Sequence, residues 1–404
     1  MKKGAYLLFL IIVAIVCCRK PYNPPAISAP NGYLVVEGVI NSGSDSTFIN
    51  LSHTVNVASK VTVNPILNAT VTVEGDQNTS YPLIEMSNGK YSCAGLNLDN
   101  SHRYRLRIKT ADNKQYLSDY MAVLNSPPID SVSYDTQGTV FSPGLNVYVS
   151  SHDPNNSVVY YRWDYQETWI FHANFSSFFK SNGDTVLGRD LLNDNITYCW
   201  RSDTASTILL GSTAKLSKDV VDKQPLISIE SSSEKVGDEY SILVRQYALT
   251  ADAYTFYTNL KKNTEQLGSI FDAQPSQLIG NLHSVTNPSD LVIGYVSVGS
   301  TSSQRIFITN KQLPGWHTVP LYSDSVCMLA FGPNAPCCYY VYPPGPPNQV
   351  DAYINYLKNN DADPLIPINA IGIPGHPPIG YTASERKCVD CTLRGSNKKP
   401  AFWK

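Results

Sequence analysis

The chain has 404 residues, enough for two or three domains, of which 42% are hydrophobic and only 16% charged. Its formal net charge is −2, with no large basic patch and no acidic tail, which argues against a nucleic-acid-binding protein. Tyrosine (26) outnumbers phenylalanine (12), and glycine (24) and proline (27) are frequent, a composition typical of β-sheets joined by turns.

The first residues have the pattern of a bacterial lipoprotein signal. Lys2 and Lys3 precede the apolar run 5–16, which is too short to span a bilayer stably and ends at Cys17 and Cys18. We expect residues 1–17 to be removed and Cys18 to be acylated, because the small Cys17 then occupies the position before the cleaved bond. Two acyl chains would anchor the protein, since each buried methylene contributes roughly 0.8 kcal/mol. A plain leader or an N-terminal membrane anchor is the alternative.

Residues 18–31 are predicted to form a proline-rich tether. Four prolines and the absence of a periodic pattern favour an extended, semi-stiff segment that holds the first domain away from the membrane. Arg19 and Lys20 follow the acylated cysteine, and this pattern leaves open whether the protein faces the periplasm or the cell surface.

Residues 32–125 are predicted to form an immunoglobulin- or fibronectin-like β-sandwich. The segment 103–109 alternates between apolar and basic residues, as expected for a strand with one wet face. Asn88-Gly89, between the apolar segments 81–86 and 90–93, is a strong hairpin signal. About seven short strands fit this segment, as in a sandwich module.

Residues 126–312 are predicted to form a larger β-rich second domain. Pro127 and Pro128 mark the boundary, because consecutive prolines do not continue a sheet. The aromatic segment 160–171 should be a strand on which Tyr161, Trp163 and Tyr165 share one face. The helix predicted at about 251–267 is N-capped by Thr250 or Asp252, presents Tyr254, Tyr257, Leu260 and Leu267 on one side, and should pack on a sheet or the end of a sandwich.

Residues 313–404 form a segment rich in proline, glycine and cysteine, which we expect to be irregular and packed on the second domain. An exported protein meets an oxidising compartment, so its cysteines more readily form disulfides than a metal site. Cys388 and Cys391 form a CxxC motif that could also be half of a zinc site or a redox pair. The surrounding sequence lacks the strand and helix of a redox site, and a zinc site would need a second, suitably spaced pair of cysteines. The candidate disulfide residues are Cys327, Cys337, Cys338, Cys388 and Cys391.

Candidate binding residues are few. Trp163, Tyr165 and Trp169 could form an aromatic platform for sugar rings, or they could be core residues. Arg162 and Arg245 lie within predicted strands and would need partners such as Asp164 or Glu167. The histidines are scattered singly, and the sequence contains no HExxH motif, nucleophile elbow or phosphate-binding loop. We therefore expect no cofactor, no metal site and no enzymatic activity, with an uncharacterised hydrolase as the least favoured alternative.

Several strings resemble one family closely. They include CRKPYNPP, YLVVEGVINSG, PPIDSV, YYRWDYQETW, YSILVRQYALT and the final CVDCTLRGSNKKPAFW. The most particular is AYTFYTNLKKNTEQLGSIFDAQPSQLIGN in the helix region. Together they resemble the Bacteroidota outer-membrane lipoprotein family described as domain of unknown function 4249, over nearly the whole mature chain.

The resemblance implies a lipid-anchored outer-membrane protein that acts as an accessory of a TonB-dependent transporter. It implies no catalytic residues, and it assigns only the lipidated cysteine, which matches Cys18. The leading expectation is therefore a non-enzymatic protein that binds a transporter barrel, its substrate, or both. A surface carbohydrate-binding lipoprotein is the alternative.

Overall fold

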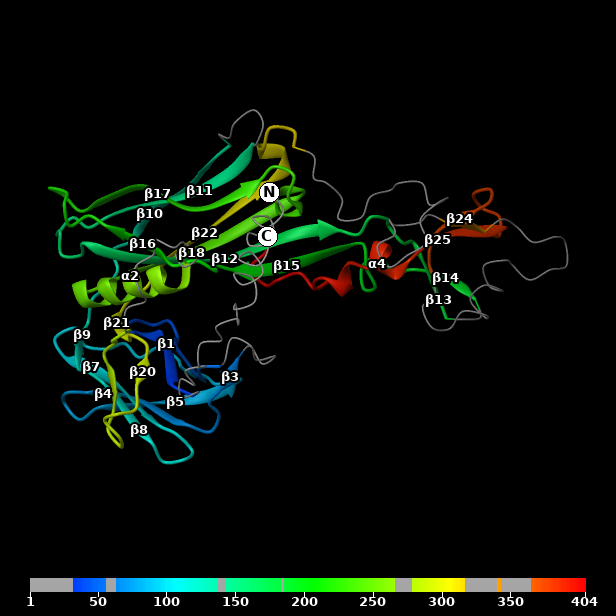
Figure 1. Ribbon diagram of the computed structural model, residues 1–404. Helices are drawn as coiled ribbons and strands as arrows, with labels where there is room; N and C mark the ends of the chain where they lie inside the picture. The colour runs from blue at the N-terminus through cyan, green and yellow to red at the C-terminus, as the bar shows by residue number, and fades with distance from the viewer. Residues whose placement is uncertain are drawn as a thin grey trace, which may run out of the picture.

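The computed structural model describes residues 32–55, 63–136, 143–182, 185–265, 278–316, 340–342 and 365–404. Cys18, the leader and the tether lie outside these residues. The described chain is mainly β, as the sequence predicts, and forms a first domain, a second domain and a smaller third lobe (Figure 1). No helix in the described part is long and apolar enough to cross a membrane.

The first domain is a β-sandwich whose two layers share one strand. Its strands are β1 (Leu34–Asn41), β2 (Thr47–His53), β3 (Asn64–Pro65), β4 (Thr70–Gly75), β5 (Ser80–Ser87), β6 (Lys90–Cys93), β7 (Arg103–Lys109), β8 (Gln115–Ser118) and β9 (Met121–Ala122). The first half of β5 pairs with β4 and the second half with β6, so β5 joins the layers. The predicted hairpin is confirmed, because Asn88 and Gly89 both have positive φ angles, 49° and 73°, as a tight β5–β6 turn requires.

Alternation along β7 gives the sandwich its core. Tyr104, Leu106 and Ile108 are buried in the core, whereas the basic residues between them lie on the opposite face. There Arg105 and Arg107 both bind Glu74 of β4, with the Arg105 Nη2 to Glu74 Oε2 distance at 2.8 Å. Although burial raises the pKa of Glu74, the hydrogen bonds and charges of the two guanidinium groups lower it overall.

The assignment of 282–299 to the predicted second domain, 126–312, is wrong, because this segment pairs with strands of the first domain. The segment contains β19 (Leu282–Ser284), β20 (Val292–Ile293) and β21 (Ser297–Gly299). β19 pairs with β8, while β20 and β21 pair parallel to β1. Val296 and Val298 are buried in the first core. An apolar pattern identifies these residues as strands, but the choice of sheet depends on pairing with residues more than 150 positions earlier.

The second domain packs two sheets against each other. One sheet contains β10 (Ile129–Asp135), β11 (Gly144–His152) and β17 (Val220–Glu230). The five-stranded sheet contains β15 (Tyr198–Thr204), β12 (Tyr160–His172), β18 (Glu239–Ala248) and β22 (Ser302–Thr309), with β16 (Leu209–Ser212) also paired to β12. The core between the sheets includes Leu145, Val147, Trp163 and Ile242. The short helices η1 (Glu234–Val236) and η2 (Asn310–Gln312) adjoin β18 and β22.

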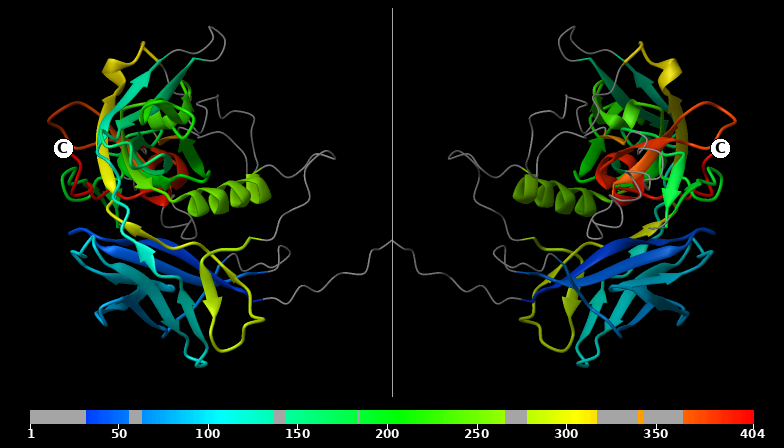
Figure 2. Two further views of the ribbon diagram at one scale, coloured as in Figure 1. Left: turned by 90° about the vertical axis from the view of Figure 1, so that its left-hand side faces the viewer. Right: turned by 90° about the vertical axis from the view of Figure 1, so that its right-hand side faces the viewer.

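Helix α2 (Ala251–Glu265) packs on the five-stranded sheet at the level where the two domains meet (Figure 2). The Thr250 Oγ1 atom accepts a hydrogen bond from the Ala253 backbone N–H at 3.2 Å, so the first of the two predicted caps is used. The helix buries Ala253 and Phe256 most deeply, whereas the predicted stripe residues Tyr254 and Tyr257 are half-buried. The predicted end at 267 lies outside the described residues.

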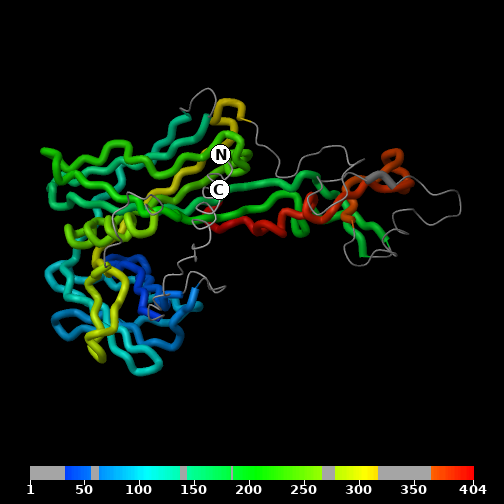
Figure 3. Tube along the Cα trace, viewed as in Figure 1, coloured from blue at the N-terminus to red at the C-terminus, as the bar shows by residue number. Residues whose placement is uncertain are grey.

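The third lobe combines the segment between β12 and β15 of the second domain with the C-terminal segment. Its elements are β13 (Phe179–Ser181), β14 (Val186–Gly188), β23 (Tyr340–Tyr342), β24 (Ile366–Ile371), β25 (Gly380–Ser384), α4 (Arg386–Val389) and η3 (Cys391–Leu393). β25 pairs with β23 and β24. From this lobe the C-terminal trace runs back beside β15 to the second domain (Figure 3), where Trp200 and Ser396 exchange two backbone hydrogen bonds.

Candidate functional site: the outer face of the five-stranded sheet

Strand β12 has one buried aromatic face and one charged face. As predicted, Tyr161, Trp163 and Tyr165 share a face, and it points into the core. The proposed sugar platform is wrong, because Trp163 and Trp169 are 1% and 3% exposed and Tyr165 is also buried. The Trp163 indole N–H donates to Gln246 Oε1 at 2.9 Å. Burial, followed by the charges of nearby acids, raises the pKa of Tyr165 to about 12.

The opposite side of this sheet is the candidate functional site, which we call the outer face. Because side chains alternate across a strand, the residues between the core residues of β12, β18 and β22 point to this side. The outer face consists of Arg162, Asp164, Gln166, Ser241, Leu243, Arg245, Tyr247, Ser303, Arg305 and Phe307.

At the end of the outer face near the domain junction, the Arg162 guanidinium packs against two aromatic rings. The Arg162 guanidinium carbon lies 4.4 Å from the Tyr247 ring centroid and 4.9 Å from that of Tyr257 on α2. These contacts replace the carboxylate partner expected from the sequence. The Arg162 Nε atom is buried without a hydrogen-bond partner. Arg162 also lines a small cavity of about 10 Å³, to which Val39 and Val298 of the first domain contribute.

In the middle of the outer face, one carboxylate fixes two neighbours. Arg245 Nη1 donates to Asp164 Oδ1 at 2.9 Å, and the Tyr247 hydroxyl donates to Asp164 Oδ2 at 2.8 Å. The Arg245–Asp164 pairing suggested by the sequence is therefore present. Glu167 lies on the core side instead, where Lys235 Nζ and the Tyr240 hydroxyl each donate to it at 2.8 Å.

Near the C-terminus, the outer face ends at Arg305 and the last aromatic residues. The Arg305 guanidinium lies 3.7 Å from the centroid of the Phe402 ring, and its Nη1 donates to Ser241 Oγ at 3.1 Å. Trp403 packs edge-on against Phe307, and its indole N–H donates to Glu239 Oε2 at 2.9 Å. Burial, and then the positive charge of Arg245, lower the pKa of Arg305.

Two linkers fix the junction between the domains. They are hydrogen-bonded to each other, from Leu124 N to Val298 O (2.9 Å) and from Ser126 N to Ser300 O (3.2 Å). Between them, Asn125 Oδ1 accepts from Ser42 Oγ and from the Ser300 backbone N–H, both at 2.9 Å. A β-carbon at Gly299 would lie 1.8 Å from the Leu124 carbonyl oxygen, so the close approach requires glycine.

The family comparison agrees with the resemblance noted in the sequence. The family described as Domain of unknown function (DUF4249) matches residues 19–305, well over half of the chain. The chain belongs to this family. Among curated proteins, no significant match is found.

The solved structures similar to this DUF4249 chain include a two-domain fibronectin type-III segment of chicken tenascin. Sequence identity is 12% and the TM-score is 0.16, with 54% of this chain and 92% of the other covered. These values are too low to support any comparison of fold or function.

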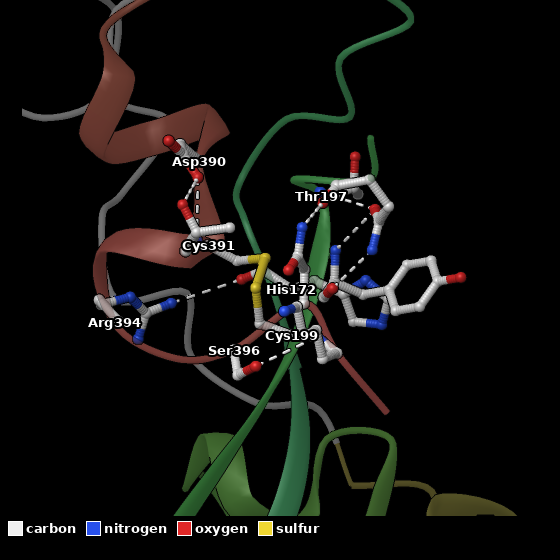
Figure 4. The surroundings of a disulfide bond; sticks show 12 residues. His172, Thr197, Cys199, Asp390, Cys391, Arg394 and Ser396 are labelled. Carbon is white, nitrogen blue, oxygen red and sulfur yellow. Dashed lines mark hydrogen bonds between the residues drawn. A yellow bond between two sulfur atoms is a disulfide. The ribbon is translucent and has the colours of Figure 1, made fainter. Parts of the chain in front are cut away.

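The cysteines of the DUF4249 chain form a bond that sequence reasoning missed. Cys391 is disulfide-bonded as predicted, but its partner is Cys199 in β15, 192 residues earlier, rather than another cysteine of the C-terminal segment (Figure 4). Cys388 is also disulfide-bonded. Cys327, Cys337 and Cys338 lie outside the described residues. The CxxC motif thus provides at least one structural bridge.

Hydrogen bonds around the Cys199–Cys391 disulfide attach the C-terminal segment to the second domain. The Cys391 backbone N–H donates to the Ile196 carbonyl at 2.8 Å. Arg394 Nη2 donates to the His172 carbonyl at 3.5 Å (Figure 4). Arg394 Nη1 also pairs with Glu234 Oε2 at 2.7 Å. The bridge therefore lies beside the edge of the five-stranded sheet. Across the described ranges, no group of three or more histidine, cysteine or acidic residues is placed to hold a metal ion.

Proposed function

We propose that this protein is a non-enzymatic, lipid-anchored lipoprotein of the outer membrane that binds a TonB-dependent transporter, its substrate, or both. The leader pattern and Cys18 support the anchor. Membership of the DUF4249 family supports an accessory role through the resemblance described above.

The observation that carries a recognition role is the outer face. Its charged side chains lie on paired strands and are held in fixed orientations by one another and by aromatic rings, as the bonds of Asp164 and Arg162 show. Such pre-ordering reduces the entropy lost when a partner binds. The paired linkers support this role further, because they join the face rigidly to the tethered first domain.

The experiment is affinity isolation of the full chain from native outer membranes, solubilised in mild detergent. The wild type should bring a TonB-dependent barrel with it and should incorporate labelled palmitate. Cys18→Ala should lose both the label and its membrane fractionation. Palmitate that never enters the wild type would refute the anchor, and repeated isolation without a barrel would refute the transporter role.

Trp163, Tyr165 and Trp169 cannot form a carbohydrate platform, because these rings are packed in the core of the second domain and offer no face to a sugar. No contact on the outer face favours a hydrolytic role either.

A further inference from the structure

The strand register places two arginines side by side on the outer face. On the β18–β22 pair, Arg245 lies opposite Ser303 and Leu243 lies opposite Arg305. Arg245 and Arg305 are therefore diagonal neighbours on one face, a relation in which residues lie about 7–8 Å apart and long side chains can reach one another. The Arg245 guanidinium bonds Asp164 on β12, whereas the Arg305 guanidinium bonds Ser241, so the two groups extend in different directions. A small group that contacts both would lie between them, over Leu243.

Within the described part of the chain, most hydrogen-bond donors of these two side chains have no acceptor. Each guanidinium has five N–H donors. Arg305 uses Nη1 for the Ser241 hydroxyl, and Arg245 uses Nη1 for Asp164. Stacking on Phe402 and pairing with Asp164 hold the two groups in place while leaving their other donors free. The unused donors are those needed for a forked contact with an oxyanion.

The charges on this part of the face are not balanced. Asp164 is shared by Arg245 and the Tyr247 hydroxyl. Among the described residues, no carboxylate lies within 4.0 Å of the Arg305 guanidinium nitrogens. Arg305 thus carries a half-buried charge next to a second cation, and the effect of Arg245 on the pKa of Arg305 reflects that repulsion. A bound anion would relieve this repulsion.

We propose that Arg245 and Arg305 form a binding site for an oxyanion group, the carboxylate or phosphate of a ligand that lies on the outer face. The neighbouring Leu243 and Phe402 provide apolar contact beside the anion, and Gln166, opposite Leu243 on β12, provides a neutral amide. The site thus favours a ligand with one acidic group and an adjoining uncharged body. This deepens the proposed function, because it assigns a ligand chemistry to the face on which recognition is proposed.

The test uses the solubilised full chain without any transporter. Glucuronate and glucose differ by one carboxylate, and their binding is compared by saturation-transfer NMR. Inorganic phosphate is titrated in parallel by phosphorus NMR. The wild type should bind glucuronate, phosphate or both, and glucose much more weakly, and added salt should weaken binding of the anions. Preference between glucuronate and phosphate distinguishes the two sources of the oxyanion.

Variants decide whether these arginines are responsible. Arg305→Ala should weaken oxyanion binding about tenfold or more, because a charge-assisted hydrogen-bond pair is lost. Arg305→Lys keeps the charge and the stacked stem but not the fork, so its affinity should lie between the two. Arg103→Ala is the matched control, since it removes the same charge from an exposed position on the first domain.

Two results would overturn the proposal. One is a wild type that binds neither anion, and the other is equal binding by the Arg305→Lys, Arg305→Ala and Arg103→Ala variants with unchanged thermal unfolding. Because no barrel is present in the assay, loss of this inference leaves the transporter proposal standing. Conversely, anion binding that depends on Arg305 would persist if no barrel were ever isolated.

Discussion

Removing the Cys199–Cys391 disulfide should destabilise the attachment of the C-terminal segment. The double variant Cys199→Ala/Cys391→Ala is the cleanest perturbation, because both side chains are buried and serine would introduce unsatisfied hydroxyls. The sequence separation is 192 residues. In the chain-entropy description, a closed loop of this length corresponds to about 5 kcal/mol at 25 °C. The second bridge, at Cys388, already restricts the unfolded chain, so we expect a loss of about 2–4 kcal/mol.

The assay is calorimetric and chemical unfolding of oxidised protein, combined with limited proteolysis. The double variant should unfold its second domain at lower temperature. Proteolysis should release residues 392–404, because non-covalent contacts such as the Trp200–Ser396 hydrogen bonds and the packing of Trp403 then hold the segment without a covalent link. Cys93→Ala is the control, since Cys93 is the free cysteine among the described residues. An unfolding free energy within about 0.5 kcal/mol of the wild type would refute the reasoning.

Three further outcomes are expected. Lys235→Met should lower the free energy of unfolding by about 3 kcal/mol, because Glu167, 3% exposed, would keep a buried charge without its cation; an unchanged denaturation midpoint would contradict this. Gly299→Ala should cost at least about 1–3 kcal/mol and widen the distribution of interdomain distances seen by small-angle scattering, whereas wild-type scattering would show that the linkers tolerate a β-carbon. The pKa of His152, followed by NMR, should lie above the ordinary histidine value of about 6.5, because the ring hydrogen-bonds to Asp130 and lies near its charge; Asp130→Asn should reverse this shift. Because the pKa is raised in the folded state, the stabilisation from this pair is complete below the unfolded pKa and is lost as pH rises through the folded pKa.

Local patterns accounted for much of the fold. The alternation in 103–109, the Asn88-Gly89 turn and the helix beginning after Thr250 each depend on neighbours in sequence, and each is present in the structure. The same period of two placed Tyr161, Trp163 and Tyr165 on one face, but it could not say which face was buried. The pattern therefore left a sugar platform and a core as alternatives for the aromatic residues, and the structure places them in the core, with the charged residues between them on the half-buried outer face.

The sequence by itself determined a mainly β chain, several strands of the first two domains, the helix and the Asn88-Gly89 turn, and a leader that predicts lipidation at Cys18, but it did not reveal the paired strands β24 and β25 in the segment expected to be irregular. Only the tertiary structure decided that residues 282–299 complete the first sandwich, that Cys391 bonds to Cys199, and that Arg245 and Arg305 become neighbours. The physical reason is the range of the interactions. Periodicity and turn chemistry act over a few residues, whereas strand pairing, disulfide partners and the exposure of a sheet face depend on segments that meet only when the chain has folded.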